Sequence, residues 1–175
     1  TVESVLGKGS CFTFTFEAKP SQQGETRLEV TAPIPVGLEP SAGGIKVLIV
    51  DDVETNREVL EALLSPLGFE IRLASSGAEA LLEHDAWLPE LLLVDIRMPD
   101  LDGLELIRRV RAQGSTVAIV AVSASAFPDD REDALAVGAD EFFAKPYSEG
   151  DVFAKISEVL PTIAFVYSDE GTSTR

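Results

Sequence analysis

The sequence predicts an α/β fold, a doubly wound parallel sheet of five strands, preceded by a small β-hairpin. Between residues 45 and 161, short apolar runs alternate five times with segments in which apolar residues recur at helical spacing. The first run, at 46–50, is β-rich and continuously apolar after Lys46, which is typical of a strand buried on both faces. Strands that alternate with helices form a parallel sheet that is covered by helices on both faces.

The apolar runs define five strands, and a helix follows each of them. The expected strands lie at 46–50, 70–74, 91–95, 117–122 and 141–144. The third, fourth and fifth helices are expected at 103–113, 129–137 and 148–160. Gly138 suits the end of the fourth helix, and Pro161 stops the fifth because proline cannot continue a helix.

The first two helices carry residues that favour particular ends. Thr55 and Glu58 fit a capping box at the start of the first helix, in which each side chain accepts a hydrogen bond from a free backbone amide. Ser76 and Glu79 fit a second capping box at the start of the next helix. Gly68 suits the C-terminal cap of the first helix, since glycine readily adopts the left-handed conformation found there.

Both ends of the chain differ from this repeat. Residues 1–17 predict a β-hairpin, because apolar and polar residues alternate at 12–16 after a turn-forming, glycine-rich stretch. Residues 18–44 hold four prolines and four glycines without a sustained apolar period, which predicts an extended linker. Residues 162–175 are expected to form a C-terminal tail.

Polar residues end or follow four of the predicted strands. They are Asp51, Asp52, Asp95, Ser123 and Lys145. The carboxyl ends of parallel strands meet at one edge of such a sheet, which is where ligands bind. Three carboxylates there raise one another's pKa values unless a cation joins them, and carboxylates with water are the ligands that Mg²⁺ prefers. With a lysine and a hydroxyl added, the set predicts a pocket for a metal ion and a phosphoryl group.

Four sequence motifs surround these residues. They are Val-Asp-Asp at 50–52, Val-Asp-Ile-Arg-Met-Pro-Asp-Leu-Asp-Gly at 94–103, Val-Ser-Ala at 122–124 and Phe-Ala-Lys-Pro at 143–146. In this order they resemble the signatures of the receiver domain of two-component response regulators, over residues 45–161. The resemblance implies a flavodoxin-like fold with strand order 2-1-3-4-5 and a function in phosphorelay signalling.

The resemblance also implies a role for each residue of the pocket. Asp95 would be the phosphoacceptor, a carboxylate nucleophile that attacks phosphorus. Lys145 would pair with a phosphoryl oxygen, and Ser123 would bind another oxygen once Asp95 is modified. The implied ligands of Mg²⁺ or Mn²⁺ are Asp51, Asp52, Asp95 and the backbone carbonyl of Arg97. No other cofactor is implied.

Three further expectations concern the surroundings of the pocket. Phe142 occupies the place of the family's switch aromatic, next to Ser123 as the switch hydroxyl, but a role in the core explains Phe142 equally well. Gly103 would permit the tight turn that closes the loop after Asp95. The other acidic residues on the first, second and fourth helices are expected to lie on solvated faces.

The N-terminal residues resemble part of a different domain. Residues 1–17, with Gly-Lys-Gly-Ser-Cys-Phe at 7–12, resemble the last hairpin of the ATP-binding domain of histidine kinases. The nucleotide-binding part of that domain is not in the sequence, so the chain is expected to act as a phosphoacceptor and not to bind ATP. A hairpin, a linker and a receiver in this order indicate a segment of a hybrid sensor histidine kinase. The implied partners are a kinase phosphohistidine domain and, as a further candidate, a histidine phosphotransfer protein.

Charge and composition exclude several classes of partner. The formal net charge is −16, with 30 acidic and 14 basic residues, and such a surface opposes binding to nucleic acid or to an anionic membrane. No apolar run approaches the ~20 residues of a membrane span. The single cysteine, Cys11, cannot form an internal disulfide, which favours a reducing, cytoplasmic setting.

Three other functions compete with that of a phosphoacceptor. A receiver-like interaction module that is never phosphorylated is the alternative, although the complete set of acidic residues argues against it. A phosphatase with an aspartate nucleophile would need a second aspartate two residues later, where this chain has Arg97. A DNA-binding regulator is not expected, because residues 162–175 are too short for a helix-turn-helix domain.

Overall fold

The computed structural model describes residues 1–5, 7, 9–15, 34–39, 44–124 and 128–167. The chain forms two compact units, Thr1–Val30 and Thr31–Arg175. Phe16, most of the expected linker and residues 168–175 of the expected tail lie outside the described residues.

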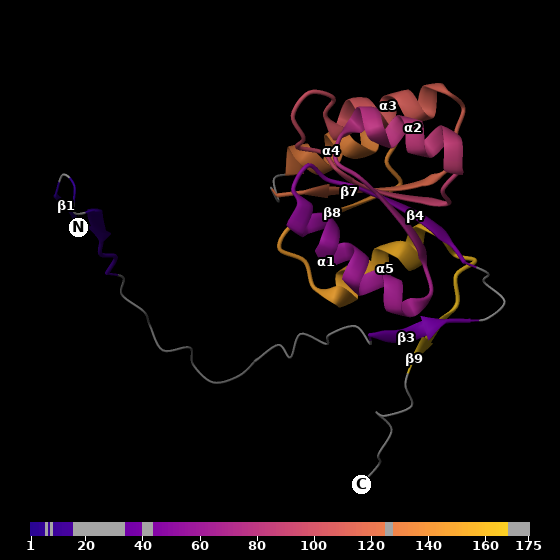
Figure 1. Cartoon of the computed structure of the whole chain (residues 1–175), viewed down its shortest axis with the longest axis horizontal. Coiled ribbons are helices and arrows are strands. Elements are labelled where there is room, and N and C mark those ends of the chain that lie inside the picture. The colour runs from indigo at the N-terminus through magenta and orange to yellow at the C-terminus, as the bar shows by residue number, and fades with distance from the viewer. Residues whose placement is uncertain (6, 8, 16–33, 40–43, 125–127, 168–175) are drawn as a thin grey trace, which may run out of the picture. The chain divides into compact units, whose positions relative to one another are not determined.

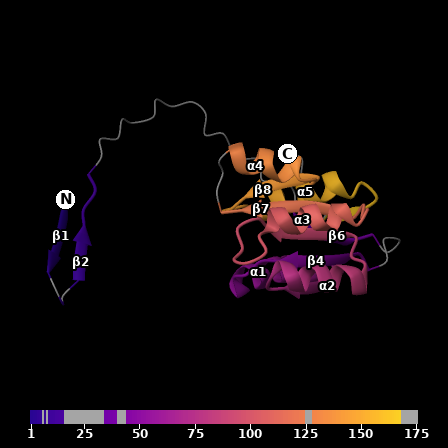
Figure 2. The ribbon, with the colours of Figure 1, turned by 90° about the horizontal axis from the view of Figure 1, so that it is seen from above.

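The first unit contains the predicted hairpin. Strands β1 (Val2–Val5) and β2 (Gly9–Phe12) pair antiparallel, with Val2 opposite Phe12 (Figures 1 and 2). Both Gly7 and Gly9 have positive φ angles, as a tight connection requires. Every residue of the two strands is exposed, so the hairpin has no core of its own among the described residues.

The second unit contains the predicted parallel sheet. Its strands are β4 (Lys46–Val50), β5 (Glu70–Ala74), β6 (Leu91–Asp95), β7 (Ala118–Ser123) and β8 (Glu141–Ala144). They lie in the order β5-β4-β6-β7-β8, and all neighbouring pairs are parallel. In chain order this is 2-1-3-4-5, so the predicted topology is confirmed.

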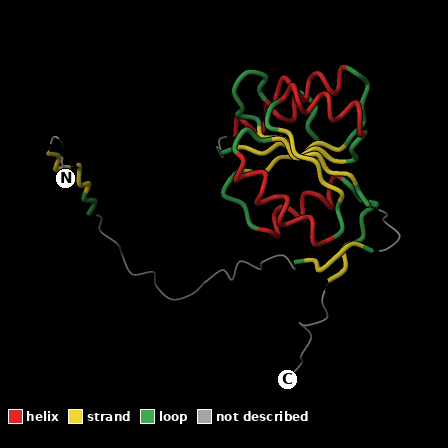
Figure 3. The backbone as a smooth tube through the Cα atoms, viewed as in Figure 1, coloured by secondary structure: helices red, strands yellow, loops and turns green. Residues whose placement is uncertain are grey.

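Helices cover both faces of this sheet (Figures 1 and 3). They are α1 (Glu54–Leu64), continued by the 3-10 turn η2 (Ser65–Leu67), α2 (Gly77–Trp87), α3 (Gly103–Ala112), α4 (Pro128–Ala136) and α5 (Glu149–Val159). Alternate residues of each strand face opposite layers. Leu48 and Val50 pack with α2, α3 and α4, whereas Val47 and Ile49 pack with α1 and α5. No helix within the described ranges is long and apolar enough to cross a membrane.

The predicted helix ends are correct in part. Helix α1 begins after Val53 without a side-chain cap, so the capping box of Thr55 and Glu58 is wrong. The start of α2 is as predicted, since the hydroxyl of Ser76 accepts a hydrogen bond from the amide of Glu79. The carboxylate of Glu79, however, accepts its bonds from Ser75 rather than from Ser76.

Two short strands lie outside the parallel sheet and form what we call the clasp. Strand β3 (Pro35–Leu38) pairs antiparallel with β9 (Phe165–Tyr167), within the segments expected to be linker and tail. The pairing continues through a 2.9 Å hydrogen bond from the amide of Glu39 to the carbonyl of Ala164. The ring of Phe165 lies 6.3 Å from that of Phe69 and 5.7 Å from that of Phe153. The clasp therefore extends the core beneath α1 and α5.

Candidate functional site

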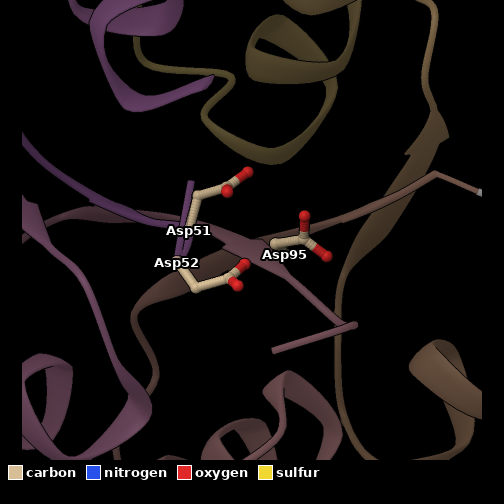
Figure 4. A group of neighbouring side chains, drawn as sticks. All are labelled: Asp51, Asp52 and Asp95. Carbon is tan, nitrogen blue, oxygen red and sulfur yellow. The ribbon is translucent and has the colours of Figure 1, made fainter. Parts of the chain in front are cut away.

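Three carboxylates meet at the carboxyl edge of the sheet. Asp51 and Asp52 follow β4, and Asp95 is the last residue of β6. One carboxylate oxygen of each residue lies within 4.8 Å of the others, and Figure 4 shows the three side chains as neighbours. Asp51 and Asp95 are buried, whereas Asp52 is exposed. The structure thus brings together the trio that the sequence analysis selected, with one side open to solvent.

Lys145 supplies a positive charge between two of these carboxylates. It follows β8, and its Nζ atom lies 2.7 Å from Oδ2 of Asp51 and 2.7 Å from Oδ2 of Asp95. The backbone amide of Lys145 donates to the carbonyl of Ser123 at 2.7 Å, which ties the lysine to β7. Burial disfavours the ammonium form, but the two carboxylates outweigh burial and raise the pKa of Lys145.

The two carboxylates that share Lys145 have pKa values shifted in opposite directions. Burial is the largest influence on both, and it opposes ionisation. At Asp95, burial outweighs the hydrogen bonds from Lys145 and from the amide of Arg97, so the pKa is raised. At Asp51, additional hydrogen bonds from Val53 and Asn56 outweigh burial, so the pKa is lowered. Asp51 is therefore the firmly ionised member of the pair.

Two residues of the first turn of α1 support the site, and neither of them was predicted. The side-chain amide of Asn56 donates to both carboxylate oxygens of Asp51 at 3.0 Å. The guanidinium of Arg57 donates to the backbone carbonyl of Asp51 at 2.5 Å. Both lie between Thr55 and Glu58, the residues of the capping box that the sequence predicts. Their position, four to five residues after the acidic pair Asp51 and Asp52, is the sequence feature from which they could have been predicted.

Ser123 and Arg97 both contact Asp130, a residue that was not predicted. The amide of Arg97 donates to Oδ1 of Asp95 at 2.7 Å. The hydroxyl of Ser123, which is fully buried, donates to Oδ2 of Asp130 at 3.3 Å. The guanidinium of Arg97 forms an ion pair with the other oxygen of Asp130. Asp130 is only 5% exposed, so the expectation of a solvated acidic face on α4 is wrong at this residue.

Phe142 lies inside the protein. It is 9% exposed on β8, opposite Ala121 of β7, and it packs in the core layer beneath α2, α3 and α4. This position agrees with the role in the core that the sequence analysis kept open. A role for Phe142 as a switch stays a prediction.

Gly103 is required for a reason that differs from the predicted one. A Cβ atom at this position would lie 2.2 Å from the carbonyl oxygen of Asp95 and 2.7 Å from Cα of Ile96. The constraint is thus the close approach of the start of α3 to the end of β6, and no left-handed turn is needed at Gly103. In this loop the residue with a positive φ is Asp100, at 66°.

We expect Gly103→Ala to reduce the free energy of unfolding by about 3 kcal/mol, because the new methyl group must displace backbone atoms. Urea denaturation measures the loss. Gly37→Ala is the matched control, since no atom lies within 4 Å of the corresponding Cβ and the change should cost less than about 0.5 kcal/mol. Equal effects of the two substitutions would contradict this account.

Known proteins have sequences similar to that of the receiver region of this chain. The profile of the response regulator receiver domain matches residues 47–157. Sensor protein EvgS of Escherichia coli K12 is 36% identical over 146 residues, which cover 83% of this chain and 12% of that protein. Transcriptional regulatory protein GltR of Pseudomonas aeruginosa is 37% identical over 130 residues, which cover 71% of this chain and 52% of that protein. The chain thus spans about half of the length of one relative and far less of the other.

Solved structures share the fold. Chemotaxis protein CheY4 of Vibrio cholerae matches with a TM-score of 0.64 and 28% identity, over 67% of this chain and 100% of that one. The receiver domain of the Francisella response regulator 1452 matches with a TM-score of 0.64 and 24% identity, over 68% of this chain and 98% of that one. By its fold, its acidic trio and its sequence, the chain belongs to the family of response regulator receiver domains, and its function is phosphorelay signalling.

Proposed function

We propose that this chain accepts a phosphoryl group from a phosphohistidine onto Asp95. One observation carries the proposal. The Asp95 carboxylate lies at the end of a central strand, beside Asp51 and Asp52 and in contact with the ammonium of Lys145. A buried nucleophile beside a fixed cation suits phosphoryl transfer, because the reaction mainly requires positioning and compensation of negative charge.

The donor set fits a hard divalent cation. Asp51, Asp52 and Asp95 converge and offer only oxygen atoms, and the exposed side of Asp52 gives access to water. We propose that these three residues, with the backbone carbonyl of Arg97, hold Mg²⁺ or Mn²⁺. When bound, the ion would supply positive charge that stabilises the transferring phosphoryl group.

Each side chain of the site would have its own role in the transfer of the phosphoryl group. A carboxylate oxygen of Asp95 attacks phosphorus while the bond from phosphorus to the histidine nitrogen breaks. The imidazole leaves with the electron pair of that bond and takes up a proton from solvent. Lys145 stabilises the phosphoryl charge, and the hydroxyl of Ser123 donates to a phosphoryl oxygen. Phe142 then follows Ser123 in a shift of the neighbouring surface.

The likeness to a sensor protein supports a wider proposal about the origin of the chain. We propose that residues 45–161 are the receiver of a hybrid histidine kinase, joined through residues 18–44 to the last hairpin of its ATP-binding domain at 1–17, with 162–175 as a tail. The donor would be a kinase phosphohistidine domain, and a histidine phosphotransfer protein would be a second partner. Exchange of phosphoryl groups with these two partners would place the receiver in the cytoplasm. This segment would bind neither nucleic acid nor a membrane.

Incubation with acetyl phosphate tests the proposal. We expect intact-mass analysis to show one phosphoryl group per chain in the presence of Mg²⁺ and none in excess chelator, because the carboxylates repel an unshielded phosphoryl group. Absence of the adduct with the metal present, in protein that is folded by circular dichroism, would instead favour the interaction module that is never phosphorylated.

A further inference from the structure

One buried contact near the site has no role in the transfer described above. The carboxylate of Asp130, in the first turn of α4, accepts a hydrogen bond from the hydroxyl of Ser123 and pairs with the guanidinium of Arg97. Asp130 thereby joins α4 to the end of β7 and to the residue two positions after Asp95. Ser123 is fully buried and Asp130 is 5% exposed, so solvent does not readily replace either partner.

From this geometry we propose that Asp130 is a positioning residue that competes with the phosphoryl group for the hydroxyl of Ser123. The inference rests on the proposed function, in which Ser123 binds a phosphoryl oxygen. A hydroxyl has a single hydrogen to donate. The hydrogen that points to Asp130 in this structure must therefore leave it before Ser123 can donate to the phosphoryl group.

The bonds that Asp130 forms with Ser123 and with Arg97 differ in strength, and this difference makes the exchange feasible. The contact from Ser123 is long for a hydroxyl bond, at 3.3 Å, and is therefore the weaker one. The ion pair with Arg97 is a charge-assisted contact and would remain after the hydroxyl turns away. Arg97 thus pairs with the carboxylate of Asp130 both before and after Ser123 turns to the phosphoryl group. Release of Ser123 therefore does not leave the buried carboxylate without a cation.

The competition would couple α4 to the state of Asp95. In the unmodified protein, Ser123 and Asp130 hold the end of β7 to the first turn of α4. When the hydroxyl turns to a phosphoryl oxygen, this link opens and the link through Arg97 remains. Asp130 therefore favours the unmodified arrangement. Part of the binding energy of the phosphoryl group is used to break the bond between Ser123 and Asp130.

Beryllofluoride, which occupies the place of a phosphoryl group on a carboxylate, provides a test in the whole chain. We expect Asp130→Ala to bind beryllofluoride, in the presence of Mg²⁺, about fivefold more tightly than the unaltered protein, which is the weight of one competing hydrogen bond. Fluorine NMR titration measures the dissociation constant. Asp129→Ala is the matched control, because it removes the same charge from an exposed position in the same helical turn.

A double-mutant cycle separates competition from a structural effect. In Ser123→Ala protein there is no hydroxyl to compete for, so adding Asp130→Ala should change the affinity by less than about twofold. An equal gain in both backgrounds, an equal gain in Asp129→Ala, or no gain in Asp130→Ala would each overturn the inference and leave the proposed function intact. If the unaltered protein binds no beryllofluoride, the proposed function fails and the inference fails with it.

Discussion

Asp95→Asn is expected to abolish the phosphoryl adduct and, in the same protein, to raise the free energy of unfolding at neutral pH without metal. The amide is not a nucleophile for phosphorus, so no aspartyl phosphate can form. The gain in stability follows from the raised pKa of Asp95, which shows that burial makes its ionised form costly. A neutral side chain of the same shape avoids this cost, and we expect a gain of about 1 kcal/mol.

The pH dependence of this gain has a definite sign. Because the pKa of Asp95 is raised in the folded state, folded protein holds the proton more tightly than unfolded protein does. Its contribution to stability is fully present below the ordinary pKa of 3.8 and is lost as pH rises through the raised value. The advantage of Asp95→Asn should therefore appear above that range and vanish below it. Urea unfolding across this pH range, together with mass analysis of the adduct, measures both effects.

Asp51→Asn is the contrasting control. The pKa of Asp51 is lowered, so its carboxylate contributes stability above the ordinary pKa and loses it as pH falls through the lowered value. At neutral pH we expect this substitution to destabilise the protein by about 2 kcal/mol, since it removes the ionised partner of Lys145 and Asn56. If both asparagine variants shift stability in the same direction at neutral pH, the opposite assignment of the two carboxylates is wrong.

Lys145→Met should slow the formation of the phosphoryl adduct by about 100-fold or more, the usual effect of losing one charged group that stabilises a transition state. Methionine is an unbranched side chain of nearly the same length, and it removes the ammonium group with its charge and its hydrogen-bond donors. Without metal, Asp51 and Asp95 then face each other without their shared cation, and we expect the free energy of unfolding to fall by about 3 kcal/mol. Stopped time points analysed by intact mass give the rate, and urea unfolding gives the stability.

Mg²⁺ should recover part of the stability of Lys145→Met, because the ion replaces the missing positive charge beside the carboxylates. Lys155→Met is the matched control. Lys155 forms ion pairs with Glu141 and Glu158 away from the acidic trio, so this change should cost at most about 1 kcal/mol and leave the adduct unaffected. A loss of rate in Lys155→Met as large as in Lys145→Met would show that net charge, and not position, matters.

The parallel sheet and the acidic trio were predictable because both depend on local patterns and one topological rule. Four of the five strands, at 46–50, 70–74, 91–95 and 141–144, have the predicted bounds, since buried parallel strands are short apolar runs between helices. The meeting of Asp51, Asp52 and Asp95 follows directly from parallel strands that end at one edge.

The features that escaped prediction depend on contacts between residues far apart in the chain. Asp130 lies in an acidic helix that resembles a solvated face, and its burial depends on the folded structure, in which it pairs with Arg97, 33 residues away. The strands of the clasp are 4 and 3 residues long, too short to show a period of two. At Gly103 the residue type was informative, but the reason, a close approach to Asp95, exists only in three dimensions.

The pairing of the clasp strands defines where the receiver would first open under tension. Pro35 lies opposite Tyr167, so the backbone enters and leaves the receiver at the same end of one antiparallel pair. Force applied through the two ends would separate the clasp one hydrogen bond at a time, beginning at this pair, and would not shear its bonds all at once. Such peeling needs little force, and it would expose Phe165 before any load reached the parallel sheet. Tension on the two ends of the receiver would therefore open the clasp before it reached the strands that carry the acidic trio.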